Sequence, residues 1–140
     1  LKDHWTNLFD LMERNHSIYF ANKREVDVEY ILPGLSLVLN LTAAYIKKRN
    51  LTITNSNMFI DLFNSTKEVP NFWNNFEIVE LAFMKRTDVQ DFIQEIDESK
   101  GIFLYRWGDA PLRYIMMTLF LNESQILNRE NMGLIYCHPC

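Results

Sequence analysis

Apolar residues recur at two distinct spacings along the chain, and the change between them predicts alternating helices and strands. Steps of three or four residues predict a first helix around Trp5, Leu8, Phe9 and Met12. The apolar run at 17–21 then predicts a short buried strand. Helical spacing returns from Leu35 to Lys48, and the basic residues that close this segment suit a helix C-terminus.

The second half of the chain repeats the alternation. Residues 50–70 are rich in Asn, Ser and Thr and predict an irregular connection with a turn of helix at "MFIDLF". The segment "NFWNNFEI" at 71–78 alternates between two faces and predicts a strand. A helix capped by Thr87 or Asp88 follows and ends near Gly101. The run "IFLYRW" at 102–107 predicts a strand covered on both faces.

The segment "GDAP" marks the end of this last predicted strand. Gly108 allows a tight turn, Asp109 is a candidate N-cap, and Pro111 fits the first turn of a helix, where its missing N–H costs nothing. The apolar face of that helix consists of Leu112, Ile115, Met116, Leu119 and Phe120.

Strands that alternate with helices predict an α/β fold with an open sheet that is mostly parallel or mixed. The length of 140 residues suits a single domain over 1–140. An apolar fraction of 48% and an aromatic fraction of 14% are typical of a globular chain. The net charge of -4 argues against a general nucleic-acid binder, and no Lys/Arg run suggests a basic patch.

Two carboxylates are candidate functional groups. Glu77 and Asp109 lie within or just past predicted strands, and ligands of open α/β sheets collect at the carboxyl ends of strands. Trp73 and Trp107 lie close to them in the sequence. Such carboxylates can bind sugar hydroxyls, act as a base or stabilise a positively charged sugar centre, whereas the alternative for Asp109 is a helix cap alone.

Sequons for N-glycosylation are frequent and indicate a secretory compartment. Five Asn-x-Ser/Thr motifs are present, starting at Asn15, Asn40, Asn50, Asn64 and Asn122. Any of these asparagines that carries a glycan has to be exposed in the folded protein. The alternative is that the five sequons reflect an Asn-rich composition alone. The longest apolar run, 32–46, is too short to span a bilayer, so we expect any membrane anchor outside these residues.

Three motifs in order carry a family resemblance: "FWNNFEI", then "YRWGDAPLRYIMMTLFL", then "YCHP". Together they resemble the fungal α-1,2-mannosyltransferases of glycosyltransferase family 15, Golgi enzymes that extend mannans. The similarity is close over 71–121, loose over 5–50 and poor over 51–70.

The resemblance implies a GT-A-like fold of which this chain is the C-terminal part, GDP-mannose as donor, Mn²⁺ as cofactor, a mannose-containing glycan or glycoprotein as acceptor, and transfer with retention of configuration. Glu77 and Asp109 match catalytic positions, the first beside the reacting sugar and the second in contact with acceptor or donor sugar. A carboxylate can attack the anomeric carbon as a nucleophile or stabilise the positive charge that develops there in the transition state.

The remaining motif positions have supporting roles in the same family. His138 matches a metal-binding histidine, which suits Mn²⁺ beside phosphate oxygens. Trp73, Arg106 and Trp107 match positions that pack and shape the substrate site. The implied localisation is the lumen of the Golgi apparatus, with a membrane anchor in the full-length protein.

The sequence also departs from the family pattern. The metal-binding tripeptide Glu-Pro-Asp is not among these residues, and the resemblance places it just upstream of Leu1. The histidine motif is longer than in the family, and Cys137 replaces one histidine. Cys137 and Cys140 form a C-x-x-C, for which disulfide pairing, with each other or elsewhere, is expected in an oxidising lumen.

Three functions therefore stay open. The first is the C-terminal part of a retaining mannosyltransferase, inactive as this fragment alone. The second is a non-catalytic sugar-binding or interaction module that keeps half of the fold. The third is an unrelated α/β domain in which Asp109 only caps a helix.

Overall fold

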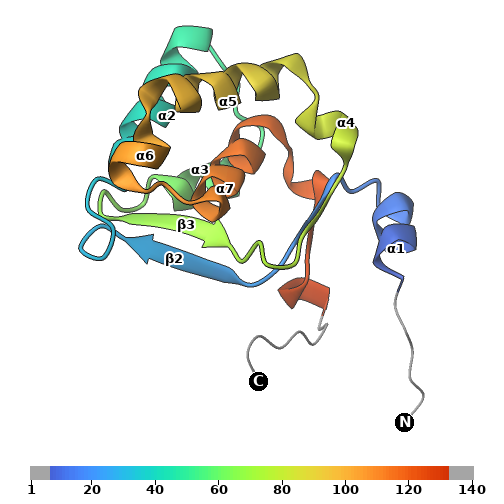
Figure 1. The fold of residues 1–140 in the computed structure, drawn as a ribbon. Coiled ribbons are helices and arrows are strands. Elements are labelled where there is room, and N and C mark those ends of the chain that lie inside the picture. Colours follow the sequence, from blue (N-terminus) through green and yellow to red (C-terminus); the bar gives the residue numbers. More distant parts are fainter. Residues whose placement is uncertain (1–6, 133–140) are drawn as a thin grey trace.

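The computed structural model describes residues 7–132, in which helices flank two small sheets (Figure 1). The helices are α1 (Leu8–Arg14), α2 (Leu37–Arg49), α3 (Ser56–Leu62), α4 (Leu81–Met84), α5 (Thr87–Ser99), α6 (Gly101–Tyr105) and α7 (Asp109–Phe120). The strands are β1 (Tyr19–Ala21), β2 (Arg24–Val28), β3 (Glu68–Phe72), β4 (Ile78–Val79) and β5 (Ile126–Asn128). Two short 3₁₀ helices, η1 (Glu123–Gln125) and η2 (Glu130–Met132), flank β5 and complete the chain order.

The central strand of the first sheet is β1, which runs antiparallel to β4 and parallel to β5. The second sheet pairs β2 with β3 in antiparallel register, so that Val26 lies opposite Pro70. Only one of the three described strand pairings is parallel, which makes the sheets mixed. The predicted α/β class with a mixed sheet is therefore confirmed.

The segment 71–78 is not the continuous strand that its alternation predicted. Its first two residues end β3, its last residue opens β4, and 73–77 form an irregular connection. The reason is that β3 pairs with β2 whereas β4 pairs with β1, so the chain crosses from one sheet to the other here. Phe76 is accordingly 38% exposed although its spacing from the buried Phe72 placed both on one face.

Helix α7 is the centre of the core and contacts β3, α3 and α5. Its buried side chains include Leu112, Tyr114, Ile115, Met117 and Leu119, which cover most of its circumference. A helix that is apolar on nearly every side has to be surrounded by other elements. Figure 1 shows α7 between the β2–β3 sheet and α5.

Helix α6 replaces the strand predicted for 102–107, and this prediction is wrong. A continuous apolar run does not distinguish a buried strand from a helix by periodicity. Here Lys100 adopts a left-handed conformation that ends α5, and a new helix begins at once at Gly101. Ile102, Phe103 and Leu104 are exposed rather than enclosed in a sheet.

Gly101 is required by the packing of Trp107. A Cβ atom at Gly101 would lie 2.2 Å from the indole ring, which is closer than carbon atoms approach. The ring stacks on Tyr105 with centroids 5.9 Å apart, and its Nε1 donates a hydrogen bond of 2.9 Å to the carbonyl of Gly34. Trp107 therefore joins the α6 region to the loop before α2.

The remaining helices form where they were predicted, but the predicted cap of α5 is wrong: its N-cap is Arg86, and Thr87 and Asp88 are its first two helical residues. Helix α2 starts two residues later than predicted and ends one residue later, and α3 overlaps the predicted turn of helix. Val89, Phe92 and Ile96 form the buried face of α5. Lys48 of α2 forms an ion pair of 2.8 Å with Glu95 of α5. Helix α1 confirms the first predicted helix from Leu8 onward; Trp5 lies outside the described residues. Within residues 7–132 no helix is long and apolar enough to cross a membrane.

Asp61 joins three elements through one carboxylate. Arg24 of β2 donates to both of its oxygens, at 3.0 Å from Nε and 2.6 Å from Nη2, and the Tyr114 hydroxyl of α7 donates to it as well. Burial acts to raise the pKa of Asp61, but the hydrogen bonds from Arg24 and Tyr114 outweigh it and hold this pKa below its usual value. The charged form of Asp61 therefore stabilises the fold.

We expect Asp61→Asn to destabilise the protein by about 1–3 kcal/mol at pH 7, because hydrogen bonds to a charged group are lost. A lowered folded-state pKa means that the stabilisation is present at neutral pH and is lost as the pH falls below the ordinary value of 3.8. Urea unfolding at pH 7 and pH 3 measures both effects. Asp91→Asn, which breaks an exposed pair with Arg49, is the matched control and should cost less than about 1 kcal/mol. Equal losses in the two variants would contradict this role of Asp61.

Candidate active site

Glu77 lies immediately before β4, and two side chains from distant elements hold its carboxylate. The Tyr19 hydroxyl of β1 donates a hydrogen bond to Oε2, and Nε of Arg113 on α7 lies 3.3 Å from Oε1. The side chains of Glu77 and Arg113 are only 16% and 27% exposed. A hydrogen bond to one oxygen and an ion pair with the other fix the position of this carboxylate.

Asp109 lies on the same helix, α7, as the Arg113 that pairs with Glu77. It lies in the first turn of the helix, four residues before Arg113, so both side chains extend from one helix face. The charges of Glu77, Arg113 and Asp109 all act on the hydroxyl of Tyr19. The charges of Glu77 and Asp109 therefore act on the same phenol, although 32 positions separate the two residues in the sequence.

Tyr19 stays protonated far above the usual pH range of a phenol. Burial raises its pKa first, and the hydrogen bond and charge of Glu77 raise it further. The charge of Arg113 opposes this shift, and the charge of Asp109 adds to it. Tyr19 is therefore a permanent donor to Glu77 at neutral pH.

The predicted reason for the placement of the two carboxylates is wrong. Glu77 precedes a strand, and Asp109 follows α6, so neither lies at the carboxyl end of a strand. The predicted cap is also wrong, because the N-cap of α7 is Gly108 and Asp109 is the first helical residue. Within residues 7–132 the Asp109 side chain bonds only its neighbour, with Oδ1 accepting from the Ala110 amide at 3.1 Å.

The three aromatic and basic motif residues lie in different surroundings. Trp73 is half-buried just after β3, and Nζ of Lys23 lies 4.9 Å from the centre of its ring. Arg106 has an exposed side chain and a left-handed backbone (φ 56°) that turns the chain from α6 toward α7. Trp107 is buried and only 5% exposed. Their roles in substrate binding stay predictions.

Sequence reasoning did not identify Tyr19, Arg113 or Asn22. The spacing of four between Asp109 and Arg113 in "DAPLR" was a usable signal for Arg113, since it places both on one helix face. Asn22 follows the central strand β1, is fully buried and donates 3.4 Å to Asn75. Among residues 7–132 its Oδ1 has no hydrogen-bond partner, which is rare for a buried polar atom and marks a polar position beside the connection at 73–77.

A metal site does not follow from the part of the chain that the structure describes. Residues 7–132 contain no group of three Asp, Glu, His or Cys side chains that could hold a metal ion. The predicted metal ligand His138, together with Cys137 and Cys140, lies outside the described residues. Glu77 and Asp109 alone do not form a Mn²⁺ ligand set.

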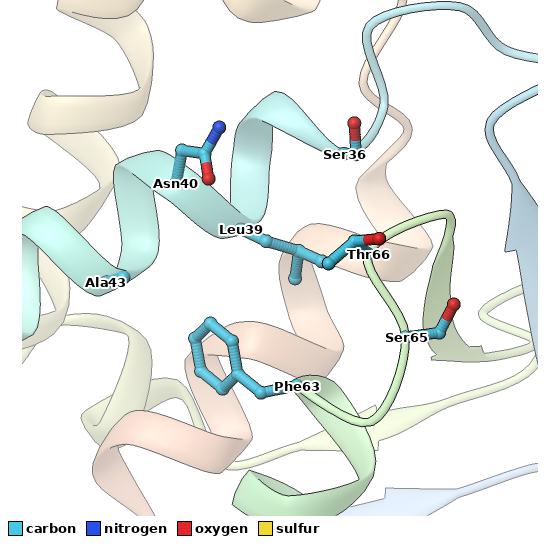
Figure 2. A pocket seen from close by; sticks show the side chains of 7 residues that line it. All are labelled: Ser36, Leu39, Asn40, Ala43, Phe63, Ser65 and Thr66. Carbon is cyan, nitrogen blue, oxygen red and sulfur yellow. The ribbon is translucent and has the colours of Figure 1, made fainter.

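A hollow of about 310 Å³ lies elsewhere, between α2 and the connection that follows α3. Figure 2 shows Leu39 and Asn40 on the helix, with the Leu39 side chain directed toward a loop that carries Phe63, Ser65 and Thr66. Its lining is apolar or neutral and includes none of the candidate site residues. The hollow is therefore separate from the candidate active site.

Comparison with known proteins identifies the family. The family model described as glycolipid 2-alpha-mannosyltransferase matches residues 5–139. The chain belongs to this family. Glycolipid 2-alpha-mannosyltransferase of Saccharomyces cerevisiae is 29% identical over 136 residues, which is 95% of this chain and 30% of that protein. O-glycoside alpha-1,2-mannosyltransferase homolog 3 of Schizosaccharomyces pombe is 43% identical over 63 residues, or 45% of this chain and 17% of that protein.

Solved structures of similar proteins agree with the fold. Core-mannan synthase A of Aspergillus fumigatus, in a Mn/GDP form, superposes with a TM-score of 0.75 at 23% identity, over 87% of this chain and 35% of that one. The mannosyltransferase Ktr4p of S. cerevisiae in complex with GDP gives 0.73 at 26% identity, over 86% and 33%. The GT-A-like fold that the resemblance implied is confirmed. The chain spans about a third of the length of relatives that it matches nearly end to end.

We expect Glu77→Gln to lower the pKa of Tyr19, because an amide lacks the negative charge that raises it. Burial should still keep this pKa above the ordinary value of 10.0. NMR of ring-labelled tyrosine through an alkaline titration measures the shift, with Tyr19→Phe to assign the signal. Tyr114, which is bound to Asp61 in the same manner, is the internal control and should not respond. An unchanged Tyr19 titration would show that the two side chains are not coupled.

Proposed function

We propose that this chain forms the C-terminal part of the catalytic domain of a retaining α-1,2-mannosyltransferase. The enzyme would transfer mannose from GDP-mannose to a mannose-containing glycan or glycoprotein. Family membership supports mannosyl transfer, and two similar structures were solved in a Mn/GDP form and in complex with GDP. The observation that carries the proposal is the Glu77 carboxylate, held between Tyr19 and Arg113 with Asp109 nearby.

The chemistry of the transfer suits a fixed negative charge. The bond between the anomeric carbon and the diphosphate oxygen breaks, and the diphosphate leaves with the electron pair. The acceptor hydroxyl oxygen then bonds to this carbon, and its proton passes to an oxygen of the departing diphosphate. Positive charge develops at the anomeric carbon in between, and a preorganised carboxylate stabilises it in the transition state.

Glu77 suits the role of charge stabiliser better than that of nucleophile. Each of its oxygens already has a partner, the Tyr19 hydroxyl or the Arg113 guanidinium. A covalent bond to sugar would compete with one of these contacts, whereas electrostatic stabilisation keeps both. We therefore assign Glu77 to the positive sugar centre and Tyr19 and Arg113 to its positioning.

Asp109 is the accessible partner in this arrangement. Its side chain is exposed in the first turn of α7, and its described hydrogen bond uses one oxygen only. We assign it to hydroxyl groups of the donor or acceptor sugar. The exposed Arg106 and the half-buried Trp73 remain candidates for shaping the same site, with Trp107 holding the α6 region that precedes α7.

Donor binding needs groups beyond those described. Mn²⁺ would neutralise the diphosphate, and the resemblance assigns its ligands to His138 and to an upstream Glu-Pro-Asp. We place the enzyme in the lumen of the Golgi apparatus, held by a membrane anchor outside these residues. A non-catalytic sugar-binding module would keep the sugar contacts but turn over no GDP-mannose, which the following experiments distinguish.

In the full-length protein, Glu77→Gln should lower kcat/KM by about 10²–10³, the scale for losing one preorganised electrostatic group. Release of GDP in the presence of a mannoside acceptor measures the rate. Binding of GDP should change little, because Glu77 acts on the sugar rather than on the nucleotide. Glu95→Gln, which affects an exposed pair with Lys48, is the control and should keep full activity. Full activity of Glu77→Gln would overturn the proposed mechanism.

Asp109→Asn should lower kcat/KM by about 10² while the melting temperature stays within a few degrees. The helix start is preserved because the N-cap is Gly108. Asp88→Asn changes the corresponding first-turn acid of α5, outside the candidate site, and is the matched control. Equal kcat/KM values for Asp109→Asn and the wild type would show that Asp109 has no part in catalysis and serves only the start of α7.

A further inference from the structure

The sequons are more frequent than the composition explains. The chain contains fourteen asparagines and thirteen serines and threonines in 140 residues. Random order of these residues would give about one sequon, against the five present. An excess of this kind requires a cause other than abundance of asparagine.

The sequon asparagines are all exposed, whereas the other described asparagines are exposed in some cases and buried in others. All five are exposed: Asn15, Asn40, Asn50, Asn64 and Asn122. Among the remaining described asparagines, Asn22, Asn55 and Asn71 are buried. An asparagine that carries an oligosaccharide has to face solvent in the folded protein. The fold therefore keeps accessible the asparagines that the motif selects.

Hydrogen bonding divides the five further. Nδ2 of Asn15 donates to the carbonyl of Leu11 at 2.8 Å, and Oδ1 of Asn122 accepts from Ser124 in the capping of η1. The side chains of Asn40, Asn50 and Asn64 make no hydrogen bond within the described residues. A bulky substituent on these three amides displaces no contact of the fold.

We propose that Asn40, Asn50 and Asn64 carry N-linked oligosaccharides. The co-reactant is a lipid-linked oligosaccharyl pyrophosphate of the secretory pathway, and the transfer is made by the host's own transferase. The amide nitrogen loses one proton and bonds to the anomeric carbon, the bond from that carbon to pyrophosphate breaks, and the lipid pyrophosphate leaves with the electron pair. This modification is independent of the proposed mannosyl transfer.

The three sites gather around α2. Asn40 lies within this helix, and Asn50 is its C-cap. Asn64 lies between Phe63 and Ser65, in the loop that lines the hollow opposite α2. Figure 2 shows the Asn40 amide directed away from Phe63. The candidate active site is built from β1, α7 and the residue before β4, so no glycan is attached to the elements that form it.

The structure also indicates that Asn40 is modified before the protein folds. The hydroxyl of its sequon belongs to Thr42, which is fully buried and donates to the carbonyl of Val38 at 2.8 Å. Thr52 and Thr66, the hydroxyl residues of the other two sequons, are exposed. Asn40 can therefore be modified only before α2 forms, on the nascent chain.

The test uses the full-length protein produced through the secretory pathway of a fungal host. Peptide N-glycosidase in H₂¹⁸O converts each glycan-bearing Asn to ¹⁸O-labelled Asp, which mass spectrometry of peptides locates. We expect label at Asn40, Asn50 and Asn64. Gln substitution at each should remove one glycan's mass from the intact protein, while Asn57→Gln and Asn75→Gln, which are exposed but outside sequons, should not.

Unlabelled Asn40, Asn50 or Asn64 in this secreted protein would overturn the assignment for that residue. A second measurement tests the order. The unglycosylated protein from bacteria, once folded, should accept oligosaccharide from a microsomal transferase at Asn50 or Asn64 but not at Asn40. Modification of Asn40 in the folded protein would contradict the argument from Thr42.

Discussion

Burial of α7 on nearly all sides is the constraint on which the rest of this structure depends. A helix whose side chains are apolar around most of its circumference is stable only when other elements surround it. The β2–β3 sheet, α3 and α5 supply this cover. Arg113 interrupts the apolar surface, and the carboxylate of Glu77 is its partner. The same packing that buries the helix therefore positions the candidate site.

The crossing of the chain between two sheets supplies the other half of that site. Residues 73–77 leave the β2–β3 sheet and enter the sheet of β1, which brings Glu77 next to Tyr19. Glu77 is thus held from one side by a strand and from the other by the central helix. For a carboxylate that acts on developing charge, such fixation matters more than exposure, because preorganised groups need no reorganisation during the reaction.

Acidic side chains serve two separate purposes in this fold. Asp61 and Glu77 each accept from a tyrosine hydroxyl and lie beside an arginine, and both tyrosines have a raised pKa caused first by burial. Yet Asp61 joins β2, α3 and α7 within the framework, whereas the hydroxyl bound to Glu77 also lies in the field of the exposed Asp109. The role that we propose for Glu77 therefore rests on its surroundings rather than on its hydrogen bonding.

The sequence by itself determined the α/β class, the helices α2, α3, α5 and α7, and the family, because helical periodicity and long ordered motifs are local properties. It did not determine α6, since a short apolar run such as "IFLY" fits a helix or a strand equally well. Nor did it determine the break at 73–77, which depends on two different partner strands. Glu77 and Asp109 were found through their motifs, but their partners Tyr19 and Arg113 were not. Only the tertiary structure decided which distant side chains meet a carboxylate, because that contact depends on how β1 and α7 pack and not on any local pattern.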